Sequence, residues 1–304
     1  MESLFSSFGF RTLWTPELIV PLVLIGVLYF YVITKLRKSF SGSQPVKLRQ
    51  KVYFLLGLFA LYLGWGSPLY VAGHLMITFH MTQMVFSYIV ATPLLLLGIP
   101  KWVYEAGIRR FHSPFSARIT KIVWNPIMAL FLFNGLFSVY HVPFVFDTLM
   151  QSAVLHSLYQ YFLFVTSIMM WWFMLAPIPN KVQLSDLRRI GYIFANGILI
   201  TPACALIIFA GQPLYETYTN PSVWATVMSF CLPAGATVPL SLFNGPDSFI
   251  FLETRMDQQL AGVLMKIMQE LAYGFTIGYV FKQWLSKEKQ QDGVLTISDI
   301  PTMK

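Results

Sequence analysis

Charge and cysteine are both scarce in this chain. Only 11% of its residues are charged, whereas ordinary soluble domains have roughly 25%, and 56% are hydrophobic. The two cysteines, Cys204 and Cys231, form no C-x-x-C pair, which argues against a thiol–disulfide oxidoreductase or a dithiolate copper carrier. The sequence also has no H-E-x-x-H, no G-x-S-x-G and no Gly-rich phosphate loop. We therefore expect a membrane protein that is not an enzyme.

Long apolar stretches make up most of the chain. Each is close to the roughly 20 residues that a helix needs to cross a bilayer. They lie at about 18–35, 52–72, 78–99, 122–141, 153–176, 190–210 and 257–284. No change in composition marks a second domain. The prediction is an all-α, polytopic bundle of seven transmembrane helices in one domain, 1–285, followed by a polar cytoplasmic tail, 286–304.

The basic residues are distributed very unevenly along the sequence. Of the 21 lysines and arginines, 18 lie in segments 35–51, 101–121, 181–189 and 282–304, which the predicted spans place on one side of the membrane. Because cytoplasmic loops carry the excess of lysine and arginine, the N-terminus is predicted outside and the C-terminus in the cytoplasm. Topology thus explains the net charge of +8, and we expect no nucleic-acid partner.

The long outer segment 211–256 differs from the other loops. It is rich in proline and glycine, and its apolar stretch "VWATVMSFCL" is too short to span a bilayer. We expect a re-entrant or interfacial cap over the outer face.

Four of the five histidines fall at the outer ends of predicted spans: His74, His80, His141 and His156. Met84 lies four residues after His80, on the same helical face. Imidazole together with thioether suits copper, especially Cu(I). Taken singly, each residue is more often a core or interfacial side chain, but the convergence of four predicted helix ends favours a metal site made of these five residues.

Lys266, Glu270 and Asp257 are charged residues of the last predicted span. Lys266 and Glu270 lie four residues apart at a depth where charge is costly, so they either neutralise each other or partners on another helix, or belong to a proton pathway. Asp257 opens the span, where it could cap a helix or supply an oxygen ligand, and we expect capping.

Several motifs resemble the CtaG family, assembly factors for the caa-type cytochrome c oxidase of Gram-positive bacteria. They are "FHMTQMVFSYIVATPLLLLG", "VYHVPFVFD", "LHSLYQYFLF" and "RMDQQLAGVLM". The resemblance implies a seven-helix protein of the bacterial plasma membrane that helps to form an oxidase copper centre. Its implied partners are an oxidase subunit and the lipid bilayer, and it could form a homo-oligomer.

The resemblance also bears on the ligands. It carries His80, His141 and His156 over as site positions. Met84 stands where the wider family has a second histidine, and Tyr159 and Gln160 replace a Glu-His pair. Two other functions stay open at this point. One is a copper or other solute transporter, and the other is a haem-binding membrane redox protein that uses the same histidines.

Overall fold

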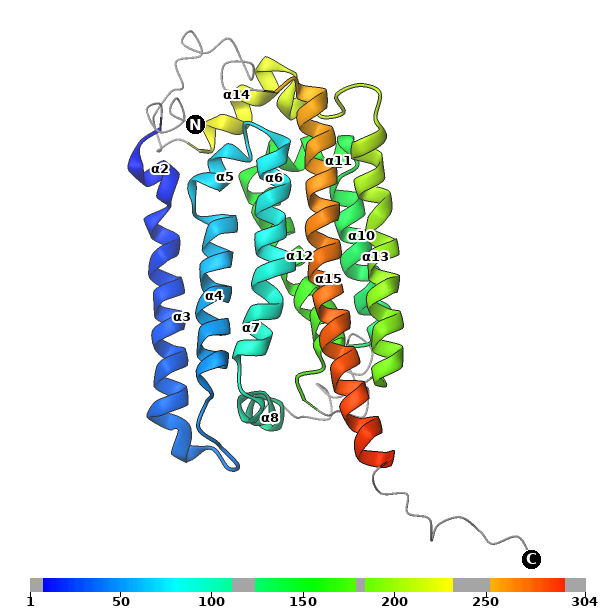
Figure 1. The fold of residues 1–304 in the computed structure, drawn as a ribbon. Helices are drawn as coiled ribbons and strands as arrows, with labels where there is room; N and C mark the ends of the chain where they lie inside the picture. Colours follow the sequence, from blue (N-terminus) through cyan, green and yellow to red (C-terminus); the bar gives the residue numbers. More distant parts are fainter. Residues whose placement is uncertain (1–7, 111–123, 179–183, 232–251, 293–304) are drawn as a thin grey trace, which may run out of the picture.

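The computed structural model describes residues 8–110, 124–178, 184–231 and 252–292, and within these ranges the regular elements are all helical. Long helices run side by side between two ends of a bundle (Figure 1). They are α3 (Pro16–Thr34), α4 (Leu48–Trp65), α10 (Pro126–Tyr140), α12 (Ala153–Leu175), α13 (Asp186–Phe209), α15 (Thr254–Asp292), and the continuous run α6 (Ile77–Met84), η2 (Val85–Ala91) and α7 (Thr92–Gly98). The shorter helices are α2 (Phe10–Trp14), η1 (Leu36–Ser39), α5 (Pro68–Ala72), α8 (Lys101–Arg110), α11 (Pro143–Met150), η3 (Glu216–Tyr218) and α14 (Pro221–Ser229).

Proline and a capping side chain start several of these helices. The Asn125 side chain accepts a hydrogen bond from the backbone of the first turn of α10, whose first residue is Pro126. Ser67 and Asn220 do the same before α5 and α14. This combination satisfies the free backbone N–H groups of a helix start, and proline lacks one of those groups.

Within the described residues, five helices are long and apolar enough to cross a membrane, or six if the bent pair α10–α11 forms one span. Their bounds lie close to the predicted spans. The last predicted span, 257–284, is not among them, because α15 is less apolar and carries Lys266 and Glu270 in its middle. It nevertheless runs beside the other long helices (Figure 1) and continues to Asp292, past the predicted start of the tail at 286. The all-helical membrane architecture is confirmed, while the count of seven and the orientation of the termini stay predictions.

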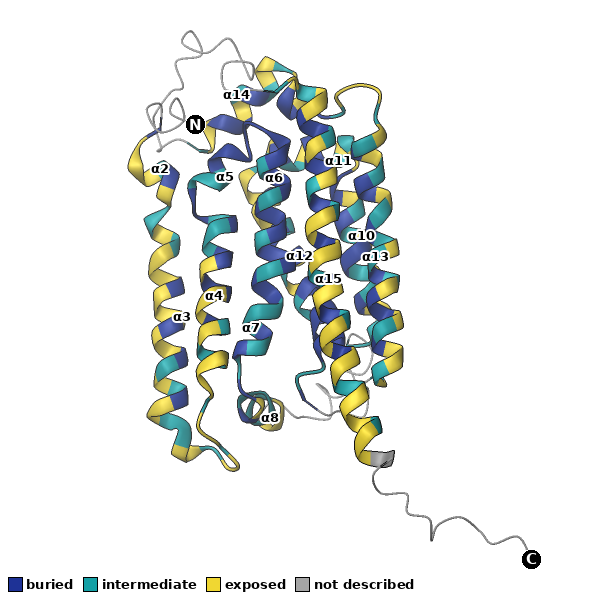
Figure 2. Ribbon diagram, viewed as in Figure 1, coloured by how far each residue is buried: buried dark blue, intermediate teal, exposed yellow. Residues whose placement is uncertain are grey.

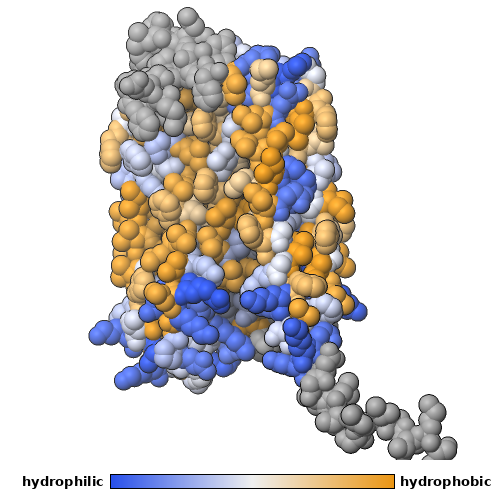
Figure 3. Space-filling view, viewed as in Figure 1, coloured by the Kyte–Doolittle hydropathy of each residue, from blue (hydrophilic) through white to orange (hydrophobic). Residues whose placement is uncertain are grey.

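The exterior of the bundle is apolar between its two ends. Large side chains such as Phe131, Phe162, Phe209 and Phe275 are exposed, and exposed residues run along the helices on the outside of the bundle (Figure 2). Figure 3 shows the resulting apolar band, with hydrophilic residues gathered beyond it at the end where α15 finishes. So much exposed apolar surface would be unfavourable in water, and its place on a helical bundle is that of a multi-pass membrane protein.

Short elements cover the opposite end, where α11, η3 and α14 lie (Figure 1). The Asp147 carboxylate on α11 accepts hydrogen bonds from the backbone of Glu216 and from both the backbone and the hydroxyl of Thr217. Asp257 caps a neighbouring helix rather than its own, because its carboxylate accepts from the backbone N–H of Ile77 at the start of α6. The predicted cap is thus helical over part of its length, and its remainder, 232–251, lies outside the described residues.

Candidate metal site at the histidine end

The four predicted histidines are buried in this same part of the bundle. Their exposed fractions are 4% for His74, 0% for His80 and His141, and 3% for His156. They come from four separate places in the chain: the α5–α6 turn, α6, the residue after α10, and the first turns of α12. The topology led us to expect that these histidines converge, and the rings of His74, His80 and His156 do so.

His156 lies close to two of the other histidines. Its ring centroid is 6.0 Å from that of His74 and 6.4 Å from that of His80. Tyr140 belongs to the same group, since its ring lies parallel to His80 at 5.7 Å and its hydroxyl is 3.0 Å from Nε2 of His156. Three imidazoles and one phenol thus share one buried cluster.

His141 joins the cluster through Tyr140, whose ring centroid is 5.1 Å away. The Nδ1 atom of His141 is 2.7 Å from the carbonyl oxygen of Phe137, so Nδ1 carries the hydrogen and donates it. Its Nε2 is then left as a lone-pair nitrogen, and that atom is buried without a hydrogen-bond partner among the described residues. A free imidazole nitrogen of this kind is the form that binds a metal.

His80 has a comparable arrangement one helix away. The side-chain amide of Gln83 lies 3.0 Å from its Nδ1, and its Nε2 is likewise buried without a partner within the described ranges. The atom nearest Nδ1 is the amide nitrogen of Gln83, so Nδ1 accepts in this orientation; a turned amide would present its oxygen, place the ring hydrogen on Nδ1 and leave Nε2 free to act as a ligand.

The remaining two histidines differ in how free their nitrogens are. Nδ1 of His74 donates to the carbonyl oxygen of Tyr70 at 2.8 Å. Burial lowers the pKa of His74, against the opposing effect of this carbonyl, so the ring is neutral at neutral pH. His156 is more constrained, because its Nε2 already lies within hydrogen-bonding distance of Tyr140 and of the Gln160 amide at 3.1 Å.

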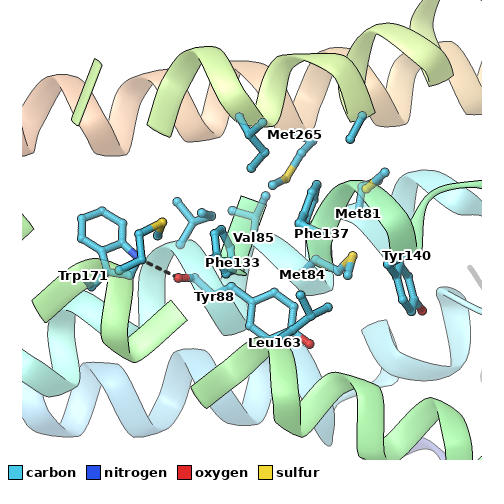
Figure 4. Close-up of a cluster of buried hydrophobic side chains, with 14 of the residues drawn as sticks. Met81, Met84, Val85, Tyr88, Phe133, Phe137, Tyr140, Leu163, Trp171 and Met265 are labelled. Atoms are coloured by element: carbon cyan, nitrogen blue, oxygen red, sulfur yellow. Dashed lines mark hydrogen bonds between the residues drawn. The ribbon is translucent and has the colours of Figure 1, made fainter. Parts of the chain in front are cut away.

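Met84 lies in the apolar core. It is 1% exposed and packs in the main cluster of buried hydrophobic residues, with Leu163 and Tyr88 beside it in Figure 4. Met81 belongs to the same cluster. The role of Met84 as a metal ligand stays a prediction.

As the side chains stand, the described residues contain no group of three or more His, Cys, Asp or Glu positioned to hold a metal ion. What they do provide is the pair of unpartnered ring nitrogens on His80 and His141, within an apolar layer that excludes water. Nitrogen donors of this type suit copper or zinc and not magnesium or calcium. Both cysteines are free thiols, with Cys204 buried in α13.

The polar partners of the histidines were not predicted from the sequence. Gln83 and Gln160 lie three and four residues after His80 and His156, a spacing that places each pair on one helical face and could have been noticed. Tyr140 precedes His141 directly. Asp147 could not have been found in this way, because its partners are about 70 residues away.

The fold and this cluster define a multi-pass helical membrane protein with a buried imidazole site at one end. The family model described as cytochrome c oxidase caa3 assembly factor (Caa3_CtaG) matches residues 27–287. The chain belongs to this family, and the suggested resemblance is confirmed. Comparison with curated proteins and with solved structures gives no match.

Proposed function

We propose that this assembly factor binds copper, as Cu(I), at its histidine end and passes it to a subunit of cytochrome c oxidase during formation of a copper centre. The end in question would face outward from a bacterial plasma membrane. The observation that carries the proposal is the pair of buried, unpartnered Nε2 atoms on His80 and His141, close to Tyr140 and His156.

Copper here is cargo, and the chain's own residues prepare its site. His80 and His141 would supply the first nitrogen ligands. The Phe137 carbonyl holds Nδ1 of His141 and so fixes its ring orientation and tautomer, and the Gln83 amide holds the ring of His80 through Nδ1. Such supporting hydrogen bonds typically change metal affinity by about 10- to 100-fold. His74, neutral and with Nε2 not committed to its Tyr70 bond, is the next candidate ligand.

Further ligands would require small side-chain movements. Met84 has three rotatable bonds and a polarisable sulfur, so its thioether could turn from the apolar cluster toward His80. His156 would have to give up its bonds to Tyr140 and Gln160. A site with few committed ligands suits a carrier, because the ion must leave for an acceptor.

Two other functions use the same histidines. A transporter needs polar groups that continue through the membrane, and Asn134, Asn196, Lys266 and Glu270 offer some. These side chains are already engaged: Asn134 donates to Asn196, and Lys266 bonds three neutral oxygens besides Glu270. Copper uptake by proteoliposomes would favour the transporter, and a Soret band in the purified protein would favour a haem protein.

Metal analysis of the purified protein tests the proposal directly. We expect copper bound under reducing conditions by the wild type and lost in both His80→Ala and His141→Ala. The control is His112→Ala, which removes a histidine that the sequence places in a basic loop away from the site. Size-exclusion profiles establish that each variant is folded. Copper retained by folded His80→Ala and His141→Ala would overturn the proposal.

A further inference from the structure

The basic end of the bundle contains two adjoining cavities, of about 540 and 1030 Å³. Arg49 at the start of α4, Ala176 after α12, and Tyr279 and Gln283 on α15 line both of them. The cavities therefore form one hollow between helices at the end where Figure 3 shows hydrophilic side chains gathered.

The hollow has a strong excess of positive charge. Among the described residues, seven basic side chains line it and Asp186 is the one acidic residue. Asp186 is already neutralised by Arg189 and by Lys287, at 3.0 and 2.6 Å. Arg189 is also committed, because it donates to the carbonyl oxygens of Met174 and Leu175 at the end of α12. Its role is structural.

Lys101 is paired with Glu105 at 3.6 Å, and four other cations remain available. Lys47, Arg49, Arg188 and Lys282 are exposed and make no ion pair with any residue in the described part of the chain. They come from α4, α13 and α15 and the chain just before α4, so an anion bound among them would tie separate helices together. Like charges gathered without a counter-charge repel one another, which makes an anionic ligand favourable here.

One wall of the hollow is apolar. Pro93, Leu96 and Leu97 of α7 line it on one side, and Phe275 lines it on α15. Phe275 is 79% exposed and belongs to the apolar surface of the bundle. The hollow thus joins a cationic rim to an apolar surface at the edge of the membrane band.

We infer that this hollow binds an anionic phospholipid, its phosphate among Arg49, Arg188 and Lys282 and an acyl chain along Leu97 and Phe275. Basic pockets between membrane helices suit anionic headgroups. The apolar wall distinguishes the ligand from a free phosphate ion, which would gain nothing from it. A lipid bound in this way bridges α4 and α15, both of which contact α6 and η2.

The test uses the full-length protein in detergent and compares two lipids with the same acyl chains, phosphatidylglycerol and phosphatidylcholine. We expect native mass spectrometry to show phosphatidylglycerol binding at least about tenfold tighter, with a higher unfolding temperature. The double variant Arg49→Gln with Lys282→Gln should bind both lipids equally. The matched control, Lys35→Gln with Arg109→Gln, removes the same charge at the same end outside both cavities and should keep the preference.

A competition experiment shows whether the hollow recognises the whole lipid or only its phosphate headgroup. Glycerol phosphate and inorganic phosphate at millimolar concentration should not displace phosphatidylglycerol. Displacement by either would mean a simple anion site and would overturn the inference. Equal binding of the two lipids by the wild type would also overturn the inference. An equal loss of the preference for phosphatidylglycerol in the two double variants would overturn it as well. The wild-type comparison needs no variant, so a misfolded variant leaves the test decisive.

Discussion

At the scale of single residues, the site depends on which nitrogen of each imidazole is engaged. The sequence predicted the four histidines and their shared end of the bundle, because charge distribution and helix length are enough for that. It could not predict that Nδ1 of His141 donates to the Phe137 carbonyl while Nε2 stays free. That result depends on ring rotation within a packed core, where Tyr140 and Phe137 fix the position of the ring.

Met84 provides the sharpest test of ligand identity. Isoleucine is similar in volume and has no ligand atom, so Met84→Ile should preserve the fold, at a cost below about 1.5 kcal/mol. If the thioether binds Cu(I), affinity should fall by more than the roughly 10- to 100-fold typical of a residue behind a ligand. Met84→His should retain copper and shift the preference toward Cu(II). A competition titration with a Cu(I) chelator measures these changes.

Met81→Ile is the matched control for that experiment. Met81 lies in the same helix and the same apolar cluster and is equally buried, at 1%. It is adjacent in sequence to His80, so its side chain leaves the helix in a different direction. Equal Cu(I) affinities for Met84→Ile and the parent protein would make Met84 a packing residue only.

At the scale of elements, hydropathy predicted the long helices well and their interruptions poorly. The predicted span 153–176 corresponds to α12, Ala153–Leu175. The bend of 78° between α10 and α11 was not predicted, although Pro143 is the first residue of α11. The π-helical turn η2 was also missed. It lies just before Pro93, which has no N–H to continue the α-helical hydrogen bonds, and π turns are one way of accommodating such a loss.

The Asp147 carboxylate joins α11 to the cap over the site, and Asp147→Asn would neutralise it. Asp147 is buried and accepts three hydrogen bonds from Glu216 and Thr217. Hydrogen bonds to a charged group contribute about 1.5–3 kcal/mol, and we expect a loss of stability of that order. Proteolysis within 211–231 should also become faster. Glu216→Gln, which changes an exposed carboxylate of the same segment, should leave the unfolding temperature and the cleavage rate unchanged.

The contact between α4 and the α6–η2–α7 run requires glycine at position 64. A methyl group there would overlap the Ser87 hydroxyl and lie 2.8 Å from the Gln83 carbonyl oxygen. Gly64→Ala should therefore destabilise the protein by about 1–3 kcal/mol and lower copper affinity, because Gln83 holds His80. Gly135→Ala, in an open position of α10, should be neutral or stabilising by up to about 1 kcal/mol. Thermal unfolding and copper titration of both variants test this, and equal behaviour of the two would contradict it.

At the scale of the whole molecule, the two ends of the bundle differ in chemistry. The four buried histidines and the cap occupy one end, and the basic hollow occupies the other, where the last turns of α15 lie (Figure 1). The sequence predicted this division from the basic residues, because the same asymmetry that orients membrane proteins also separates the two sites. Hydropathy was less informative for α15, whose Lys266 and Glu270 form an ion pair at 2.6 Å that partly offsets the cost of charge at that depth.

Orientation in the membrane can be measured with cysteines introduced at the two ends. Gln212, just after α13, and Gln290, near the end of α15, lie at the histidine end and the basic end respectively, and both are exposed. If 18 of 21 basic residues face the cytoplasm, a membrane-impermeant maleimide should label Gln212→Cys in intact cells. It should label Gln290→Cys only after the cells are opened. The parent protein, which retains Cys204 and Cys231, gives the background.

Labelling of Gln290→Cys alone in intact cells would reverse the topology. The histidine end would then face the cytoplasm, and a copper carrier working at the outer face would be excluded.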